Sequence, residues 1–252
     1  MSSNDLLAIV TGTSSGLGAA IARILLAQDW TVVGLSRRRP DLASPGYRHI
    51  EIDLGDLPRL REIAESELAP IVAAPKWRRI GLVNNAGAIG SMRALEQADP
   101  LQVASVFAVN LIAPIFLTGF VVRTAPPPSP LRIVNVSTGA AVQAIPGIGD
   151  YGSSKAALRL ASMTFAAELA SSERPGGARP HTSILSYAPG VVDTSMQESA
   201  RTDRPWNRLF VDFHAQGKLV PADAPAREVV EFLSGDGNEP FLERRFGENK
   251  SG

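Results

Sequence analysis

Tyr151 and Lys155 are the residues whose types and spacing point most directly to chemistry. They lie four positions apart in a stretch with helical periodicity, so their side chains share one face, one turn apart. A phenol titrates near pH ~10, and a nearby positive charge lowers such a pKa by roughly 1 to 3 units. We therefore expect Tyr151 to exchange a proton near physiological pH. Many helices show this spacing by chance, so the pair needs support from other segments.

A glycine-rich turn at residues 11–18, TGTSSGLG, directly follows the first apolar run and leads into an apolar helical stretch. Glycines let the backbone approach a ligand closely, and a helix N-terminus offers unpaired N–H groups to a phosphate. The turn predicts a site for the pyrophosphate of a dinucleotide, and a plain tight connection is the alternative. The residues expected to contact the cofactor are Gly12, Ser14, Ser15, Gly16, Leu17 and Gly18.

The second apolar run ends in cations, Ser36 followed by Arg37, Arg38 and Arg39. A site specific for NAD would favour a carboxylate here, whereas the planar fork of arginine suits a ribose 2′-phosphate. We therefore predict NADP(H) as the cofactor, with Arg37 in contact and Ser36 assisting. Arg38 and Arg39 are expected to form a solvated basic loop, since one phosphate cannot engage three adjacent side chains.

Short runs of apolar and β-branched residues, which predict buried strands, alternate with longer stretches of helical spacing. The predicted strands are 6–11, 31–35, 47–52, 80–84, 131–136 and 182–187. The predicted helices are 17–28, 57–73, 101–124, 151–170 and 224–233. This alternation indicates an α/β fold with a doubly wound, Rossmann-type parallel sheet and helices on both faces. We expect a single domain over residues 1–252.

The composition is that of an ordinary folded protein and limits the chemistry. Of 252 residues, 44% are apolar and 20% charged, and 25 basic residues balance 25 acidic ones. No global field therefore draws the chain to nucleic acid or to an anionic membrane. The absence of cysteine excludes disulfides, zinc-thiolate sites and cysteine nucleophiles. His49, His181 and His214 are far apart without an acidic cluster, so we expect no metal site.

The sequence also predicts where the chain resides. The N-terminus has no basic region and only a short apolar run, unlike an export signal. The later apolar runs are also interpreted as too short to span a bilayer. We expect a soluble, cytoplasmic protein without a membrane partner.

Several segments occur in the order typical of one large enzyme family. They are 11–18, Asp53-Leu54, Asn84-Asn85-Ala86-Gly87, Asn110, Val136-Ser137-Thr138, Tyr151 with Lys155, and PGVVDT at 189–194. Together they resemble the short-chain dehydrogenase/reductase family in its compact, single-domain form, over residues 6–196. The resemblance implies hydride transfer between a nicotinamide cofactor and a small-molecule carbonyl or alcohol. It also implies a homodimer or homotetramer.

The resemblance assigns catalytic roles. Tyr151 gives its proton to the carbonyl oxygen, while Lys155 tunes the phenol and hydrogen-bonds the nicotinamide ribose. The family's usual pair of serines appears here as Ser137 and Thr138. An ungapped register to Tyr151 makes Thr138 the hydroxyl that holds the substrate, with Ser137 beside the cofactor. Asn110 would position water for a proton relay to Lys155, and a buried asparagine that satisfies backbone groups is the alternative.

The resemblance also assigns cofactor contacts at other strand ends. Asp53, next to Leu54, would bind the adenine amino group. In the turn 84–87, Asn84 and Ala86 are given the firmer contacts, whereas Asn85 and Gly87 are interpreted mainly as turn residues that line the site. The contacts expected after the sixth strand are Pro189, Gly190, Val192 through its backbone, and Thr194.

The C-terminal part is expected to serve the substrate. Residues 194–220 correspond to the family's mobile lid, and Met196, Trp206 and Phe210 would either line an apolar pocket or pack as core. The sequence around 135–141 and 188–197 looks closest to the sepiapterin reductase and benzil reductase group, which implies dicarbonyl or aromatic ketone substrates. The tail lacks the family's usual ending, leaving Phe241 and Leu242 as the expected remnant of a last strand.

Two other functions are weighed. A non-catalytic NADP-sensing regulator would keep the glycine turn but typically lose the Tyr151 and Lys155 pair. A nucleotide-sugar epimerase or dehydratase shares that pair but usually carries a longer C-terminal substrate domain. After Thr194 only a lid and one helix are predicted here. The sequence therefore favours an NADPH-dependent carbonyl reductase.

Overall fold

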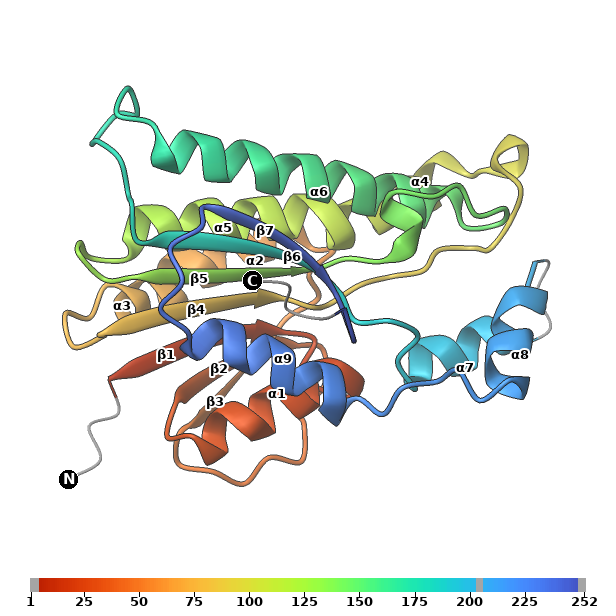
Figure 1. Ribbon diagram of the computed structural model, residues 1–252, viewed down its shortest axis with the longest axis horizontal. Helices are drawn as coiled ribbons and strands as arrows, with labels where there is room; N and C mark the ends of the chain where they lie inside the picture. Colours follow the sequence, from red (N-terminus) through yellow and green to blue (C-terminus); the bar gives the residue numbers. More distant parts are fainter. Residues whose placement is uncertain (1–4, 203–205, 249–252) are drawn as a thin grey trace.

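Seven parallel strands form the central sheet in the computed structural model, which describes residues 5–202 and 206–248. Their spatial order is β3-β2-β1-β4-β5-β6-β7, and every neighbouring pair is parallel (Figure 1). The strands are β1 (Leu6–Thr11), β2 (Thr31–Ser36), β3 (Tyr47–Glu51), β4 (Arg79–Asn84), β5 (Leu131–Val136), β6 (Thr182–Ala188) and β7 (Phe241–Arg245). This is the predicted doubly wound fold in one domain.

Helices cover both faces of the sheet (Figure 1). One face carries α1 (Gly16–Ala27) and α9 (Asp223–Ser234). The other carries α2 (Leu57–Ile63), η1 (Ala64–Leu68), α3 (Ala69–Val72), α4 (Pro100–Phe107), η3 (Ala108–Ile112), α5 (Ala113–Thr124) and α6 (Gly149–Ala170). The remaining elements are the short turns η2 (Leu95–Gln97) and η4 (Gly139–Ala141), and the protruding helices α7 (Ser195–Arg201) and α8 (Arg208–Ala215).

Each central strand is buried on both sides, as expected for a parallel sheet between two helical layers. In β1, Leu7 and Ile9 pack into the core under α2, α5 and α6, whereas Ala8 and Val10 pack toward α1 and α9. Successive side chains of a strand point to opposite faces, so this apolar run supplies both cores. The two cores therefore hold the strand ends in fixed relative positions.

The predicted strands and long helices lie within one or two residues of those observed. The last strand extends beyond Phe241 and Leu242, because the polar residues 243–245 also pair with β6 at the edge of the sheet. Within the segment predicted as a lid, residues 195–201 and 208–215 form helices α7 and α8. The expectation about apolar runs is wrong: Pro100–Thr124 is long and apolar enough to cross a membrane. However, 61% of that apolar stretch is buried within the fold, as in a core helix.

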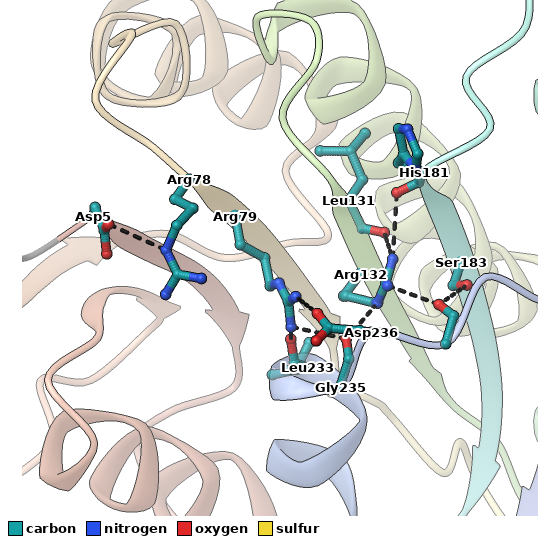
Figure 2. A network of polar contacts seen from close by, with 11 residues as sticks. Asp5, Arg78, Arg79, Leu131, Arg132, His181, Ser183, Leu233, Gly235 and Asp236 are labelled. Atoms are coloured by element: carbon teal, nitrogen blue, oxygen red, sulfur yellow. Dashed lines mark hydrogen bonds and ion pairs between the residues drawn. The ribbon is translucent and has the colours of Figure 1, made fainter.

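Two buried arginines fix the edge of the sheet opposite the carboxyl ends of its strands (Figure 2). Arg79, at the start of β4, donates to the carbonyls of Leu233 and Gly235 at the end of α9 and pairs with Asp236. Arg132, in β5, donates from Nε to the Gly235 carbonyl and from Nη2 to that of Gly237, at 3.2 and 2.7 Å. The guanidinium groups thus satisfy carbonyls that the end of a helix leaves unpaired. They anchor the connection from α9 to β7.

Candidate active site

The strand order puts β1 beside β4, where the direction of winding reverses. In such sheets ligands bind in the crevice outside the carboxyl ends of the strands at this point. The structure brings the expected cofactor residues to this edge from six separate segments. They lie at or just after the carboxyl ends of β1 (12–18), β2 (36–37), β3 (53–54), β4 (84–87), β5 (137) and β6 (189–194).

The glycine turn has the geometry of an anion site. Gly12 and Gly16 adopt φ of +73° and +56°, in the left-handed region that favours glycine. Ser15 precedes α1 in an extended conformation, and its side chain does not cap the helix. The first turn of α1 carries no acidic residue. Its N–H groups and positive dipole end therefore suit a pyrophosphate.

Two other loops lie against this turn. The hydroxyl of Thr11 accepts from the backbone amides of Asn85 and Ala86, each at 2.9 Å. Asn85 in turn donates from Nδ2 to the carbonyl of Thr11 at 2.9 Å. An idealised Cβ on Gly16 would lie 2.8 Å from the methyl group of Thr194, in the loop after β6. A side chain at position 16 would collide with Thr194, so glycine lets the turn and this loop come close together. The N–H groups at the start of α1 then lie next to this loop, and these residues fit a dinucleotide.

Asn84 differs from its expected role. Its side chain is 1% exposed and donates to Asn135 Oδ1 at 2.7 Å and to Thr118 Oγ1 at 3.3 Å, within the core. The side chain of Asn84 therefore braces β4 against its neighbours, and only its backbone remains for a cofactor. The hydrogen bonds of Asn85 agree with its interpretation as a turn residue.

The end of β2 shows a second difference. The Ser36 hydroxyl donates to the Arg38 carbonyl at 2.9 Å, so its single proton is already in use. Ser36 therefore shapes the basic turn rather than offering a donor to a phosphate. Arg37 is exposed at the same edge. Further along, Asp53 is exposed and accepts from the Gly55 amide at 2.9 Å, while Leu54 is buried beneath it.

Three of the expected catalytic groups come from the segment after β5 and from α6. Thr138 caps the N-terminus of η4 by accepting from the amide of Ala140 at 3.3 Å, and it hydrogen-bonds the phenol of Tyr151. Lys155 is 3% exposed and donates from Nζ to the carbonyl of Val136 at 2.8 Å. Of the two neighbouring hydroxyls, that of Thr138 is the one paired with the phenol.

The pKa of Tyr151 contradicts the sequence-based expectation. Burial raises the pKa of this phenol, while the hydrogen bond to Thr138 acts in the opposite direction. Burial also lowers the pKa of Lys155 to about 8. Desolvation disfavours the charged form of both groups. Tyr151 and Lys155 lie one turn apart on α6, as their spacing predicted, but a spacing carries no information about desolvation.

Asn110 lies in η3, a π-helical turn between α4 and α5. Its side chain is fully buried and bonds the backbone N–H and C=O of Ala88, both at 2.8 Å. Its Nδ2 also donates to Ser154 at 3.0 Å, and Ser154 donates to the Tyr151 carbonyl at 2.7 Å. The structure therefore shows Asn110 satisfying backbone groups. Ser154 was missed in the sequence, although its position three residues after Tyr151 puts it on the same helix face.

Gly87 lies at the centre of these groups. An idealised Cβ on Gly87 would be 3.4 Å from Asn110 Oδ1, 3.7 Å from Met196 Cε and 3.9 Å from Lys155 Nζ. The missing side chain leaves room between the lysine and the lid segment. Gly87 therefore belongs to the site as well as to its turn.

Residues 194–202 and 206–220 form an arm over this edge. At its base Val192 bridges to Val220. Ala200 and Phe210 pack with Met92, and Tyr151 borders this apolar cluster. Trp206, in contrast, is 51% exposed. Met196 thus faces the site, Phe210 packs as core, and Trp206 lies against Gly147 in the loop before α6.

Comparison with known proteins places the chain in a family. The family model described as short chain dehydrogenase matches residues 6–205. The chain belongs to the short chain dehydrogenase family. This short chain dehydrogenase is therefore an oxidoreductase that works on CH–OH and C=O groups with a nicotinamide coenzyme.

Relatives of this short chain dehydrogenase cover nearly its whole length. Benzil reductase ((S)-benzoin forming) of Bacillus cereus is 32% identical over 237 residues, with 89% of this chain and 92% of the relative covered. Sepiapterin reductase of Bos taurus is 30% identical over 254 residues, covering 91% and 90%. A short-chain dehydrogenase/reductase structure from Burkholderia vietnamiensis is 34% identical with a TM-score of 0.68, over 79% of this chain and 89% of that one. The predicted subgroup is confirmed.

Proposed function

We propose that the protein is an NADPH-dependent carbonyl reductase that acts on ketones or dicarbonyls. The observation that carries this proposal is the Thr138 hydroxyl paired with the Tyr151 phenol, one helical turn from the buried ammonium of Lys155. These three groups lie at the strand edge that also carries the glycine turn. Their arrangement suits the transfer of one proton to a carbonyl oxygen.

Each group has a separate role in the proposed reduction of the carbonyl. The coenzyme, when bound, supplies a hydride for the carbonyl carbon. Thr138 holds the carbonyl oxygen, and Tyr151 donates its phenolic proton to that oxygen as negative charge develops there. The charge of Lys155 stabilises the phenolate that remains. Burial keeps Tyr151 protonated beforehand, which suits a group that must give up a proton.

The apolar surroundings support a substrate with aromatic or dicarbonyl character. Met92, Phe210 and Ala140 surround the phenol side of the site, and Met196 faces Gly87. The relatives that reduce benzil and sepiapterin both act on compounds with ring systems and carbonyl groups. We therefore place the substrate in this class, and Met196 among the residues that contact it.

The basic turn supports NADPH over NADH. Arg37 is exposed at the end of β2, where a ribose 2′-phosphate would lie. The other cofactor contacts are those of the six strand ends, with Ser36 acting indirectly and Asn84 through its backbone. We further propose a cytoplasmic enzyme that forms a homodimer or homotetramer. Exposed apolar residues on α4, η3, α5 and α6 support an interface there: Leu101, Ile112, Ile115, Leu160 and Met163.

The other two functions rank below this one. A regulator has no need for the phenol, hydroxyl and ammonium to be held together. Among the described residues after Thr194, α9 and β7 pack with the main sheet and are not part of a separate sugar-nucleotide domain.

Coenzyme oxidation tests the proposal. We expect consumption of NADPH, and little of NADH, with benzil, sepiapterin or a related aromatic ketone. Arg37→Ala should raise the KM for NADPH about 10-fold or more, because a charge-assisted hydrogen bond contributes about 1.5 to 3 kcal/mol. The KM for NADH and the behaviour of the matched variant Arg38→Ala should stay near wild type. No turnover with any carbonyl would favour the regulator, and an unchanged NADPH preference in Arg37→Ala would refute the assignment of Arg37.

A further inference from the structure

Three hydroxyl groups form a chain beneath the proposed coenzyme site. Thr13, in the glycine turn, is fully buried, and its Oγ1 lies 2.9 Å from the phenolic oxygen of Tyr47 in β3. The same Oγ1 lies 3.2 Å from Oγ of Ser36 at the end of β2. Ser36 donates to the carbonyl of Arg38. The chain therefore runs from the edge strand, through the glycine turn, to the basic turn.

The direction of each hydrogen bond follows from proton counting. A carbonyl can only accept, so the single proton of Ser36 points to Arg38. Ser36 must then accept from Thr13, and Thr13 must accept from Tyr47. Burial raises the pKa of Tyr47, so this phenol stays protonated and able to donate. Hydrogen bonds aligned in one direction polarise and strengthen one another.

Gly34 shows that the sheet makes room for this chain. It lies in the middle of β2, where glycine weakens a strand and often marks a close approach. An idealised Cβ at this position would overlap the hydroxyl of Tyr47 and would lie 2.6 Å from Thr13 Oγ1. A side chain there would displace the hydroxyl pair. Gly34 therefore weakens β2 locally but leaves the space in which Tyr47 contacts Thr13.

The chain connects the two segments to which the proposed function assigns the coenzyme phosphates. Thr13 lies within the turn that suits the pyrophosphate, and Ser36 shapes the turn that carries Arg37. We infer that Tyr47 is a positioning residue for the coenzyme, which holds these two turns at the spacing that NADPH requires. This inference rests on the proposed function. Tyr47 itself is distant in the fold from Tyr151 and takes no part in proton transfer.

Binding measurements on Tyr47→Phe test the inference without relying on turnover. The variant keeps the ring and removes the hydroxyl at the start of the chain. Calorimetric titration with NADPH, NADH and adenosine 2′,5′-bisphosphate gives three dissociation constants. We expect affinity for NADPH and for the bisphosphate to fall about 3- to 10-fold, as for loss of one hydrogen bond. NADH affinity should fall less, because only the pyrophosphate turn holds its phosphates.

Two further variants separate positioning from folding. Tyr187→Phe removes another buried phenol, which donates to Glu228 on α9 at 2.8 Å, and should lower the melting temperature without changing coenzyme affinity. Thr13→Val breaks the chain at its centre. It should lower NADPH affinity as Tyr47→Phe does, and the double variant should lose no more than the larger single loss.

The outcomes distinguish the inference from the function on which it rests. Equal affinity of the wild type for NADH and NADPH would overturn the coenzyme preference alone, since Tyr47→Phe must then still weaken both coenzymes. Dissociation constants within 2-fold of wild type for both Tyr47→Phe and Thr13→Val would overturn the inference alone. An equal loss of affinity in Tyr187→Phe would also overturn it, because the effect would then be one of general stability.

Discussion

At Thr138 one hydroxyl serves two partners, the amide of Ala140 and the phenol of Tyr151. This pairing supports the register that places Thr138, not Ser137, at the substrate. Threonine differs from the family's usual serine by a β-methyl group. This methyl restricts χ1 and so limits the positions of the Thr138 hydroxyl. The register follows from a residue count along the sequence, and the catalytic role of Thr138 stays a prediction.

Alanine variants at the two hydroxyls give a prediction at this scale. Thr138→Ala should lower kcat by about 10²-fold or more, since one oriented donor to a developing oxyanion contributes on that order. Ser137→Ala, the matched control, should keep most of kcat. Steady-state NADPH oxidation with a reducible diketone measures both. The reverse pattern, with Ser137 essential and Thr138 dispensable, would shift the register by one residue.

Helices and strands could be predicted where apolar residues recur with a helical or strand period. They were harder to predict where polar contacts hold them. Strand β1 shows its two cores in its own sequence, whereas β7 is held by pairing with β6 and by the arginines beneath it. The spacing of Arg79 and Arg132 in the sequence does not predict that both guanidinium groups bind at the end of α9. Such contacts join residues more than 100 positions apart and depend on topology.

The arginine contacts predict unequal effects for two of the arginines labelled in Figure 2, Arg132 and Arg78. Arg132→Met leaves the carbonyls of Gly235 and Gly237 without these donors, which should cost about 1 to 3 kcal/mol of unfolding free energy. Arg78→Met removes a surface ion pair with Asp5 and should cost at most about 1 kcal/mol. Urea denaturation measures both. Equal stability of the two variants would mean that the buried arginine does not anchor β7.

The charged form of Lys155 in the site lowers the stability of the whole molecule. Burial lowers the pKa of Lys155 from 10.5 to about 8, although its Nζ donates to the carbonyl of Val136. The unfolded chain therefore binds more protons between these two values, and the charged lysine destabilises the fold below about pH 8. The fold class followed from the sequence, but this cost did not, because it depends on how completely the layers exclude water.

The pH dependence of stability tests this cost. Each pKa unit corresponds to 1.36 kcal/mol, so the gap predicts about 3 kcal/mol. Relative to Lys155→Met, the unfolding free energy of the wild type should rise by about this amount from pH 7 to pH 10.5. A difference between wild type and Lys155→Met that is constant with pH would show that Lys155 keeps its ordinary pKa.

Proton donation by Tyr151 is the central claim, and Tyr151→Phe tests it most directly. The variant keeps the ring that borders the apolar cluster and removes only the hydroxyl. The measurement pairs kcat for reduction of an aromatic diketone with the dissociation constant of NADPH. We predict a loss of kcat of about 10² to 10⁴-fold, as for removal of a general acid, with NADPH affinity within about 2-fold of wild type. Near-normal kcat in a variant that still binds NADPH would contradict the account.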